Sequence, residues 1–576
     1  MPNSQNIIRG GLGNDTIIGG LGQDNLQGGE GDDLFIHTNA VYYDTYNGGA
    51  GNDTLQGTSG DDVFRFNSFS GNNTVEAIDG VSGTDTIEGT SSNNHLNFSN
   101  TTLSNISEID GGAGHDTIVG TSGDDTIIGG LGQDSLQGGD GDDTIQTGDG
   151  ADTVFDISGT NTITTGRGGD TVTVGFGATS TGAGFDTIYL EGGGTVYAGG
   201  GRDTIEIRET TAVVYGDAGN DFFTLTTRGF FQGALFGGEG SDTLELTRGT
   251  MISVMGAFED MPEVQVVSGI ETIIGSDGGD EVSLEEDDVS LEARQGSDDV
   301  AVYSNGNFVD LGGGNNTIAI YGGDADIRGG ANADRFDVVG SGDNVVINDV
   351  GGADRLELSG QSVVADLGDG RDEFYLIAAF DSAATSVDLG DGVDYAYLSD
   401  NIGFLDLGAG ADRVEIDNVI EARITLGAGA DVIALTEFTT DSDLELTDFN
   451  LSEDRLDLGD IDTLAEFDSV TQTGDHVVLF TPSFEGAELR RRQGAAGYSL
   501  EELEAIVRPM LPEGEIESVA TETWGDNASI EIRLKGADQR TIDPSALADE
   551  IRMAAAGRIP GAEIDVRAQS GLWILR

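Results

Sequence analysis

Residues 10–36 read GGLGNDTII, GGLGQDNLQ and GGEGDDLFI, three nine-residue units in continuous register. A longer array begins at Gly111 and follows the same pattern, G-G-x-G-x-D-x-U-x, in which U is an apolar residue. Its sixth position recurs every nine residues, at Asp116, Asp125, Asp134, Asp143, Asp152, Asn161 and Asp170. The length of 576 residues alone would suggest three or four ordinary domains, but repetition at a short fixed period predicts a stack of similar units instead.

Each position of the unit has a physical role. Glycine adopts the positive φ angles of tight loops and lets backbone groups approach closely. The D-x-U-x part predicts a short strand, in which the aspartate and the apolar residue two places later point to the same side. Two units then form one coil, and loops on one side recur every 18 residues at the strand spacing of about 4.8 Å. We therefore predict a mostly β fold, a parallel β-roll, which is a β-helix solenoid.

The stacked loops would bring carboxylates and carbonyl oxygens together between successive coils. Hard oxygen ligands in a flexible cage suit Ca²⁺ better than Mg²⁺, which requires a stricter octahedron. The predicted cofactor is therefore Ca²⁺, bound at several places along the roll.

The repeats at residues 10–36, 48–66 and 111–173 resemble the RTX, or hemolysin-type, calcium-binding repeats. The resemblance implies a calcium-loaded β-roll, folding that depends on Ca²⁺, and export by the type I secretion machinery through an uncleaved C-terminal signal. The ligand position of that family falls on Asp15, Asp24, Asp33, Asp53, Asp62, Asp116, Asp125, Asp134, Asp143, Asp152 and Asp170. Glycine carbonyls of the same loops would complete the ligand shells.

Downstream the nine-residue unit fades, but an interval of 18 residues persists at Asp280, Asp298, Asn316 and Asp334. Asp394 belongs to a continuation of this series at intervals of 18–22 residues. The opposite face of each coil lacks G-G-x-G loops, which predicts ions on one side. An isolated Gly-x-Asp is often only a solvated turn, so the assignment of these aspartates as metal ligands rests on their regular spacing. The additional candidate metal ligands are Asp186, Asp203, Asp221, Asp242, Asp280, Asp298, Asp334, Asp354, Asp372, Asp412 and Asp431.

These patterns predict four consecutive parts. They are a first roll (1–245) with calcium loops on both faces and an irregular insert (67–110), an irregular connector (246–274), a second, degenerate roll with a cap (275–485), and a small C-terminal domain (495–576). Residues 443–458 resemble the closing segment after the rolls of serralysin-like proteases and secreted lipases. Residues 471–480 are expected to cap the second roll, because an exposed sheet edge invites pairing.

The C-terminal domain has a different pattern. It predicts a helix at 498–508, strands at 516–523 and 528–534, a helix at 543–556 and a strand at 563–566. This order favours a small α+β, ferredoxin-like unit. It resembles a porter subdomain of RND efflux transporters through SIEIRLK (529–535), QR (539–540), EIR (550–552) and IPGAEIDV (559–566). That subdomain normally lies between transmembrane helices, which this sequence lacks, so transport activity is not expected.

Composition excludes several functions. The 104 acidic residues against 26 basic ones give a net charge of −78, which disfavours nucleic acids and anionic membranes as partners. The absence of cysteine excludes disulfides, thiolate metal sites and a cysteine nucleophile. No apolar run is long enough for a membrane span, and the first residues lack signal-peptide features. The four histidines form no H-E-x-x-H motif, and no G-x-S-x-G or Walker motif occurs.

Two functions fit this sequence. The first is a secreted, non-enzymatic calcium-binding protein with a structural or adhesive role toward a cell-surface or matrix component. The second is a calcium-dependent folding or secretion module of an RTX exoenzyme (protease, lipase or epimerase) or toxin. The first is favoured because no catalytic constellation is visible.

Overall fold

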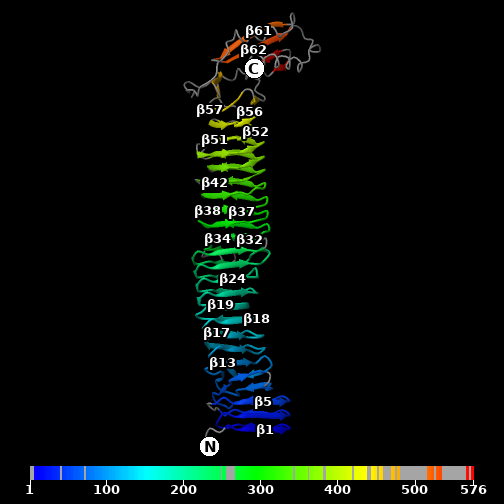
Figure 1. The fold of residues 1–576 in the computed structure, drawn as a ribbon, viewed down its shortest axis with the longest axis vertical. Coiled ribbons are helices and arrows are strands. Elements are labelled where there is room, and N and C mark those ends of the chain that lie inside the picture. The colour runs from blue at the N-terminus through cyan, green and yellow to red at the C-terminus, as the bar shows by residue number, and fades with distance from the viewer. Residues whose placement is uncertain are drawn as a thin grey trace. The chain divides into compact units, whose positions relative to one another are not determined.

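The computed structural model describes residues 5–38, 42–70, 73–247, 250–254, 266–340, 344–360, 362–379, 384–417, 419, 421–437, 443–450, 453–457, 469–473, 476–480, 516–524, 527–534, 566–569 and 572–575. The chain divides into two compact units, residues 1–294 and 295–576. Figure 1 shows the strands of each unit stacked in successive coils. Each unit is built from parallel strands that stack coil upon coil. The described residues contain no α-helix, and the helices predicted at 498–508 and 543–556 lie outside them.

The first unit shows the predicted coil most clearly around residue 130. Strand β15 (Thr126–Leu131) pairs in parallel with β13 (Ile106–Ala113) on one side and β17 (Thr144–Asp149) on the other. The pairing aligns residues 18 apart, so that Ile127 lies between Ile109 and Ile145. On the opposite face β16 (Ser135–Gln137) lies between β14 (Thr117–Val119) and β18 (Thr153–Thr164). Two nine-residue units therefore make one coil, and the prediction of a parallel β-solenoid is confirmed.

The core is a column of the apolar U residues. Ile118, Ile127 and Ile145 are fully buried, and Leu136 is 2 % exposed. The side chains between them point outward, because strand residues alternate between the two sides. The stack continues with β19 (Thr171–Ser180), β21 (Thr187–Leu190), β22 (Thr195–Tyr197), β24 (Thr204–Ile207), β25 (Val213–Tyr215), β27 (Phe222–Leu225), β29 (Ala234–Phe236) and β31 (Thr243–Leu246).

Coils also form where the sequence predicted an irregular insert and connector. In the insert, β10 (Asp85–Glu88) pairs in parallel with β7 (Val63–Arg65) and with β13. In the connector, β33 (Val266–Ser268) pairs with β29, and β34 (Thr272–Ile274) pairs with β31. The described parts of both segments thus continue the stack. Longer turns conceal the repeat in the sequence, because they change the spacing between strands without removing the strands.

The glycine loops of the first unit are themselves stacked. Short strands within them form a parallel four-stranded sheet of two-residue segments, β20 (Ala183–Gly184), β23 (Gly200–Gly201), β26 (Ala218–Gly219) and β30 (Glu239–Gly240). Backbone pairing therefore holds each loop against the loops of the adjacent coils. This pairing fixes the positions of the aspartates that follow the loops.

The second unit repeats the arrangement with a regular loop on one side only. One face contains β37 (Asp299–Val302), β39 (Thr317–Ile320), β41 (Arg335–Val339), β44 (Arg355–Gly360), β47 (Glu373–Ala379), β50 (Tyr395–Leu398), β53 (Arg413–Asp417) and β56 (Val432–Glu437). The other contains β38 (Asn307–Asp310), β40 (Ala325–Arg328), β42 (Val345–Asn348), β45 (Val363–Asp366), β48 (Ser386–Asp388), β51 (Ile402–Asp406), β54 (Glu421–Thr425) and β57 (Asp443–Leu446). The loops from the second face to the first stack through β43 (Gly351–Gly352), β46 (Asp369–Gly370), β49 (Asp391–Gly392), β52 (Ala409–Gly410) and β55 (Ala428–Gly429).

Antiparallel pairing replaces the parallel pattern toward the C-terminus. Strand β60 (His476–Phe480) pairs antiparallel with β57 and with β59 (Ser469–Thr473). Farther along, β61 (Ile516–Trp524), β62 (Asn527–Leu534), β64 (Leu572–Leu575) and β63 (Val566–Gln569) form an antiparallel sheet in that order. The strands predicted at 516–523 and 528–534 coincide with β61 and β62. The α+β, ferredoxin-like domain stays a prediction, and so do the four domain boundaries.

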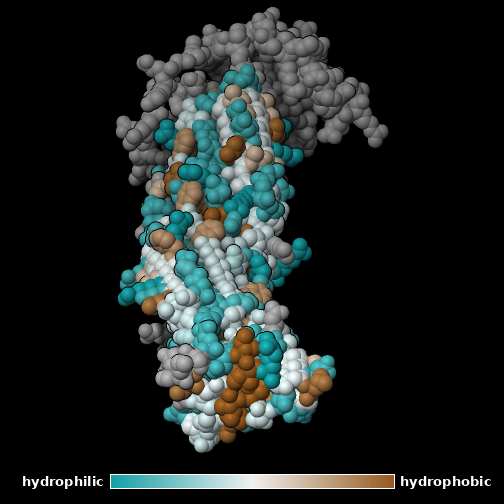
Figure 2. Space-filling model, turned by 60° about the horizontal axis from the view of Figure 1, so that its bottom comes forward, coloured by the Kyte–Doolittle hydropathy of each residue, from teal (hydrophilic) through white to brown (hydrophobic). Residues whose placement is uncertain are grey.

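The face drawn in Figure 2 is mainly hydrophilic to neutral, with an apolar patch at the end of the first unit where β1 (Ile7–Leu12) lies. Exposed large apolar side chains of this first coil are Ile7, Leu12 and Ile18. Strand β1 is the edge strand of its three-stranded sheet. Among the described residues, no helix is long and apolar enough to cross a membrane.

Candidate metal centres

The sixth-position aspartates form a ladder along the first unit. The backbone N–H of Asp116 donates to Oδ1 of Asp134 at 2.8 Å, and the N–H of Asp134 donates to Oδ1 of Asp152 at 2.8 Å. Each carboxylate is therefore held by the aspartate one coil before it. The same bond links Asp152 to Asp170 and continues through Asp186, Asp203, Asp221 and Asp242 to Oε2 of Glu271.

Parallel ladders occur elsewhere in both units. In the first unit they connect Asp15, Asp33, Asp53 and Glu76, then Asn6, Asp24 and Asp44, and finally Asp125, Asp143 and Asn161. In the second unit one ladder connects Asp298, Asn316, Asp334, Asp354, Asp372, Asp394, Asp412, Asp431 and Asp454. The candidate ligands thus gather in columns, one residue for each coil.

The second carboxylate oxygen, Oδ2, lacks a hydrogen bond at most of these rungs. Within the part of the chain that the structure describes, Oδ2 is buried without a partner in Asp15, Asp24, Asp33, Asp53, Asp116, Asp134, Asp143, Asp152, Asp170, Asp186, Asp203, Asp221, Asp242, Asp354, Asp372, Asp412 and Asp431. Asp85 and Asp394 share this property. A buried carboxylate oxygen without a partner is costly, so a column of them indicates places for cations.

The first glycine of the repeat leaves an open space beside Oδ2. A Cβ added to Gly129 would lie 2.7 Å from Oδ2 of Asp134 and 2.7 Å from the carbonyl oxygen of Thr147 in the next coil. A Cβ on Gly111 would lie 2.8 Å from Oδ2 of Asp116 and 2.7 Å from the Gly129 carbonyl oxygen. A carboxylate and a carbonyl of successive coils thus border one small space. This donor set fits the oxygen ligands that Ca²⁺ prefers.

Asparagine at a rung provides an internal test of this interpretation. Asn161 accepts the N–H of Asp143 at 2.9 Å and so keeps the ladder bond. Its Nδ2 donates to the carbonyl oxygen of Ser158 at 2.8 Å. In the second unit Nδ2 of Asn316 likewise donates to a loop carbonyl, that of Gly314, at 3.4 Å. At the asparagine rungs, an electropositive N–H group therefore hydrogen-bonds a loop carbonyl. At the aspartate rungs the equivalent atom is Oδ2, which cannot donate to that carbonyl.

Burial shifts the protonation of the ladder carboxylates. It raises the pKa of Asp134 to about 6, and the charges of Asp116 and Asp152 act in the same direction. Burial raises the pKa of Asp203 and of Asp372 to about 7, with neighbouring ladder carboxylates adding to the effect. Protons and cations therefore compete for the same oxygens.

Three predicted ligands have a different environment. Oδ2 of Asp62 accepts the N–H of Thr58 at 2.5 Å, and Oδ2 of Asp125 accepts the N–H of Thr121 at 2.6 Å. Asp280 is bonded in the same way by Ser276 at 2.7 Å. In each loop a hydroxyl residue stands in place of the second glycine and satisfies the carboxylate locally. Calcium ligation at these positions stays a prediction.

The first position of the repeat also varies along the chain. Thr147, Thr165 and Thr181 occupy it in the later coils of the first unit, and the Thr147 hydroxyl donates to the Thr165 carbonyl oxygen at 2.8 Å. In the second unit five loops have fully buried leucines there, Leu311, Leu367, Leu389, Leu407 and Leu426. These loops lack the glycine that leaves space beside Oδ2 in the first unit.

Several ladder residues escaped the sequence analysis. Asp44, Glu76, Asp85, Glu271 and Asp454 accept ladder N–H groups, but they follow the preceding rung by 20–29 residues. A fixed period cannot find them. The sequence feature that could have identified them is an acidic residue next to a predicted strand. His115 is exposed, and its Nδ1 accepts the N–H of Gln133 at 2.8 Å.

A comparison with protein families agrees with this geometry. The family model for the RTX calcium-binding nonapeptide repeat (4 copies) matches residues 3–35, 44–75, 79–97, 110–145, 128–155 and 137–172. No curated protein matches the chain. The chain therefore contains RTX calcium-binding repeats, which are typical of secreted proteins. The matched ranges end at residue 172, whereas the aspartate ladder continues to Asp242 in the first unit and recurs in the second.

The resemblance of the tail to a transporter subdomain has no such support. Of its motif residues, 529–534 lie in β62, and residues 539–540, 550–552 and 559–565 lie outside the described residues. It stays a prediction.

Proposed function

We propose that this chain is a secreted calcium-binding repeat protein whose β-roll folds on binding Ca²⁺ outside the cell, with a structural or adhesive role. The observation that supports it best is the column of buried, unpartnered Oδ2 atoms beside glycine loops. The RTX repeats support the choice of metal. The proposal assigns no catalytic step to the chain and includes export by the type I secretion machinery, as the resemblance implies.

The ladder aspartates and the glycine-loop carbonyls would hold the ions. Bound Ca²⁺ would supply positive charge between stacked carboxylates and link one coil to the next. The chain itself supplies the positions, because ladder N–H groups fix each Oδ1 and backbone pairing fixes each loop. The calcium sites are thereby pre-arranged only when adjacent coils are stacked, which couples ion binding to folding.

The net charge explains why folding should require the ion. At −78 the chain repels itself, and its 92 glycines make the unfolded state high in conformational entropy. A cation that binds only the stacked state stabilises it by about 1.4 kcal/mol per site at ten times the dissociation constant. Four such sites together contribute about 5.6 kcal/mol, which reaches the lower end of the stability of a typical domain, about 5–15 kcal/mol.

Circular dichroism of the full chain tests the proposal. In excess EDTA we expect the β signal to be weak, and it should rise cooperatively as Ca²⁺ is added, with a midpoint of about 10⁻⁴–10⁻³ M. Mg²⁺ at the same concentrations is the matched control and should have little effect. A full β spectrum in EDTA that Ca²⁺ leaves unchanged would refute calcium-dependent folding.

A further inference from the structure

Two buried aspartates lie outside the sixth position of the repeat. Asp156 and Asp349 each stand five residues before a ladder residue, at the first position of the repeat, where the earliest loops of the chain have glycine. Asp156 is 1 % exposed and Asp349 is 8 % exposed. The repeat pattern gives neither of them a role, although a carboxylate at this position is directed at the neighbouring rung.

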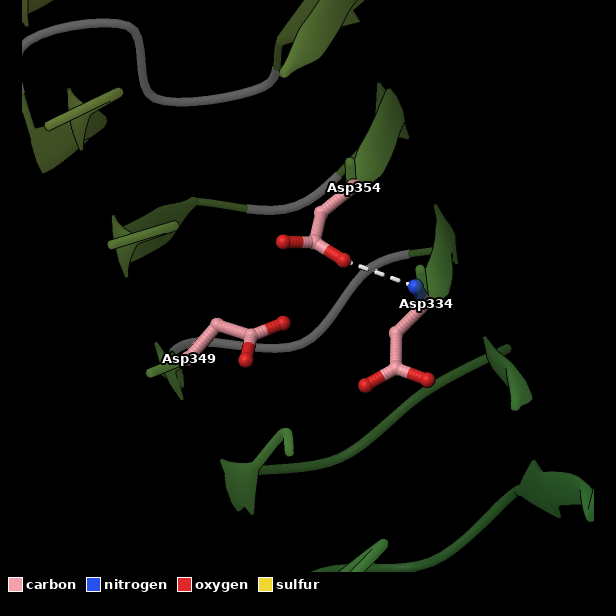
Figure 3. Close-up of side chains that lie close together, drawn as sticks. All are labelled: Asp334, Asp349 and Asp354. Carbon is pink, nitrogen blue, oxygen red and sulfur yellow. Dashed lines mark hydrogen bonds between the residues drawn. The ribbon is translucent and has the colours of Figure 1, made fainter. Parts of the chain in front are cut away.

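Asp349 completes a cluster of three carboxylates in the second unit. One carboxylate oxygen each from Asp334, Asp349 and Asp354 lies within 4.8 Å of the other two. Figure 3 shows the three side chains around one space between successive loops. The N–H of Asp334 donates to Oδ1 of Asp354 at 2.7 Å, which fixes two of the three groups relative to each other.

The free oxygens of this cluster face the shared space. Among the described residues, Oδ2 of Asp349 and Oδ2 of Asp354 are buried without a hydrogen-bond partner. Oδ1 of Asp349 accepts the N–H of Val350 at 2.6 Å, and Oδ2 of Asp334 accepts the N–H of Gly330 at 3.1 Å. Three buried carboxylates with so few donors around them would repel one another strongly unless a cation lay between them.

Glycine at position 329 makes the arrangement possible. Gly329 is the first residue of the repeat that contains Asp334, and a Cβ there would collide with the carboxylate of Asp349. In the first unit most of the equivalent glycines face a backbone carbonyl of the next coil, as Gly129 faces Thr147. At Gly329 a charged side chain thus replaces a neutral carbonyl.

The same arrangement occurs in the first unit. A Cβ on Gly138 would collide with Oδ2 of Asp143 in its own repeat and with Oδ2 of Asp156 in the next coil. Both carboxylate oxygens of Asp156 are buried without a partner within the described part of the chain. Here the rung after Asp156 is Asn161, so two carboxylates border the space. The recurrence in separate units argues against chance.

We propose that Asp156 and Asp349 are metal ligands, each adding a carboxylate to one rung and creating a tighter divalent-cation site than the rungs that rely on carbonyl oxygens. The inference rests on the proposed calcium-binding function and goes beyond the repeat pattern, whose only side-chain ligand is the sixth-position aspartate. Affinity for Ca²⁺ increases with the number of charged ligands. The cluster of Asp334, Asp349 and Asp354 is therefore the first to fill as calcium rises.

Equilibrium dialysis of the full chain against radioactive Ca²⁺ tests the assignment. Wild type should show a tight class of sites, and Asp349→Asn should lose one ion from it or weaken that step by about tenfold or more. The matched control, Asp369→Asn, makes the same charge change at an exposed position in β46 and should leave binding unchanged. Asp156→Asn should remove one tight ion in the same way.

The outcomes separate this inference from the function on which it rests. If Asp349→Asn and Asp156→Asn both bind Ca²⁺ with wild-type number and affinity, the extra ligands are wrong while the calcium ladder stands. If wild type itself binds no Ca²⁺ at millimolar concentration, the proposed function fails and this inference with it. Circular dichroism of each variant in excess Ca²⁺ shows whether a loss of binding is due to misfolding. If Asp349→Asn does not fold, Asp156→Asn tests the same inference in the other unit.

Discussion

Replacing Asp134 by asparagine should have opposite effects with and without calcium. Asn161 shows what the new side chain can do, since it keeps the ladder bond and donates Nδ2 to a loop carbonyl. Asparagine at position 134 would likewise accept the N–H of Asp116 and offer an N–H group to the carbonyl of Thr147. It therefore removes a buried charge and a metal ligand while leaving the fold intact.

The gain without calcium follows from the raised pKa of Asp134. Burial raises this pKa from 3.8 to about 6, so at pH 7 the folded state holds a charge that the unfolded state solvates better. The cost is about 1–3 kcal/mol, and it disappears when the pH falls below the unfolded value because both states are then protonated. In EDTA at pH 7 the variant should thus be more stable by this amount, and at pH 3.5 the difference should vanish.

The loss with calcium follows from mass action. At Ca²⁺ concentrations of 10 to 100 times the dissociation constant, each site contributes about 1.4–2.7 kcal/mol to the stability of the folded state. The variant lacks the Oδ2 ligand beside Gly129, so it forfeits at least one such contribution. In saturating Ca²⁺ it should therefore be less stable than wild type.

Two circular dichroism curves of the full chain measure both effects: the β signal in EDTA as the pH is lowered from 7 to 3.5, and urea unfolding in saturating Ca²⁺. Asp140→Asn is the matched control, because Asp140 is an exposed loop aspartate of the same region. The control should change neither curve by more than about 0.5 kcal/mol. If Asp134→Asn destabilises the chain equally in EDTA and in Ca²⁺, Asp134 has only a structural role and the reasoning is refuted.

Three further outcomes follow from the ladder. Because burial raises the pKa of Asp203 to about 7, the β signal in EDTA should fall as the pH rises from 4 to 8, and saturating Ca²⁺ should flatten that profile; a signal that rises with pH contradicts the assignment. Gly130→Ala should cost about 2 kcal/mol or more, because φ is +107° and a Cβ would collide with a carbonyl of the previous coil, whereas Gly123→Ala, with no atom closer than 3.8 Å, should be nearly neutral; equal chemical-denaturation midpoints would argue against the loop stacking. Asp394→Ala should shift the calcium midpoint less than Asp134→Ala, because a buried leucine, Leu389, stands at the first position of the Asp394 loop. Equal shifts would show that both units bind calcium alike.

The nine-residue period was sufficient to predict the coil. Because strand side chains alternate, Asp134 and Leu136 had to point inward, and the structure buries both. Because two units close one coil, residues 18 apart had to be neighbours, as the bond from Asp116 to Asp134 confirms. Fold class and the main ladder are therefore local properties of the repeat.

Where the number of residues per coil varies, the sequence could not predict which residue of the next coil accepts a given ladder N–H. The N–H of Asp53 reaches Glu76, 23 residues away, and that of Asp242 reaches Glu271, 29 residues away. A turn can lengthen without disturbing the strands on either side, so the sequence interval between stacked residues changes while their spacing in the sheet stays the same. The strands of the predicted insert and connector escaped detection for the same reason.

The environment of each carboxylate likewise depended on the tertiary structure. The motif treats Asp125 and Asp134 alike, but their environments differ. The hydroxyl and N–H of Thr121 donate to Oδ2 of Asp125, whereas Oδ2 of Asp134 is buried without a partner. Asp349 has no place in the motif, and only stacking brings it to Asp334 and Asp354. The sequence by itself determined which residues face inward, because alternation along a strand is local. Which oxygens share a space was decided by the stacking of coils, because that depends on groups far apart in the chain.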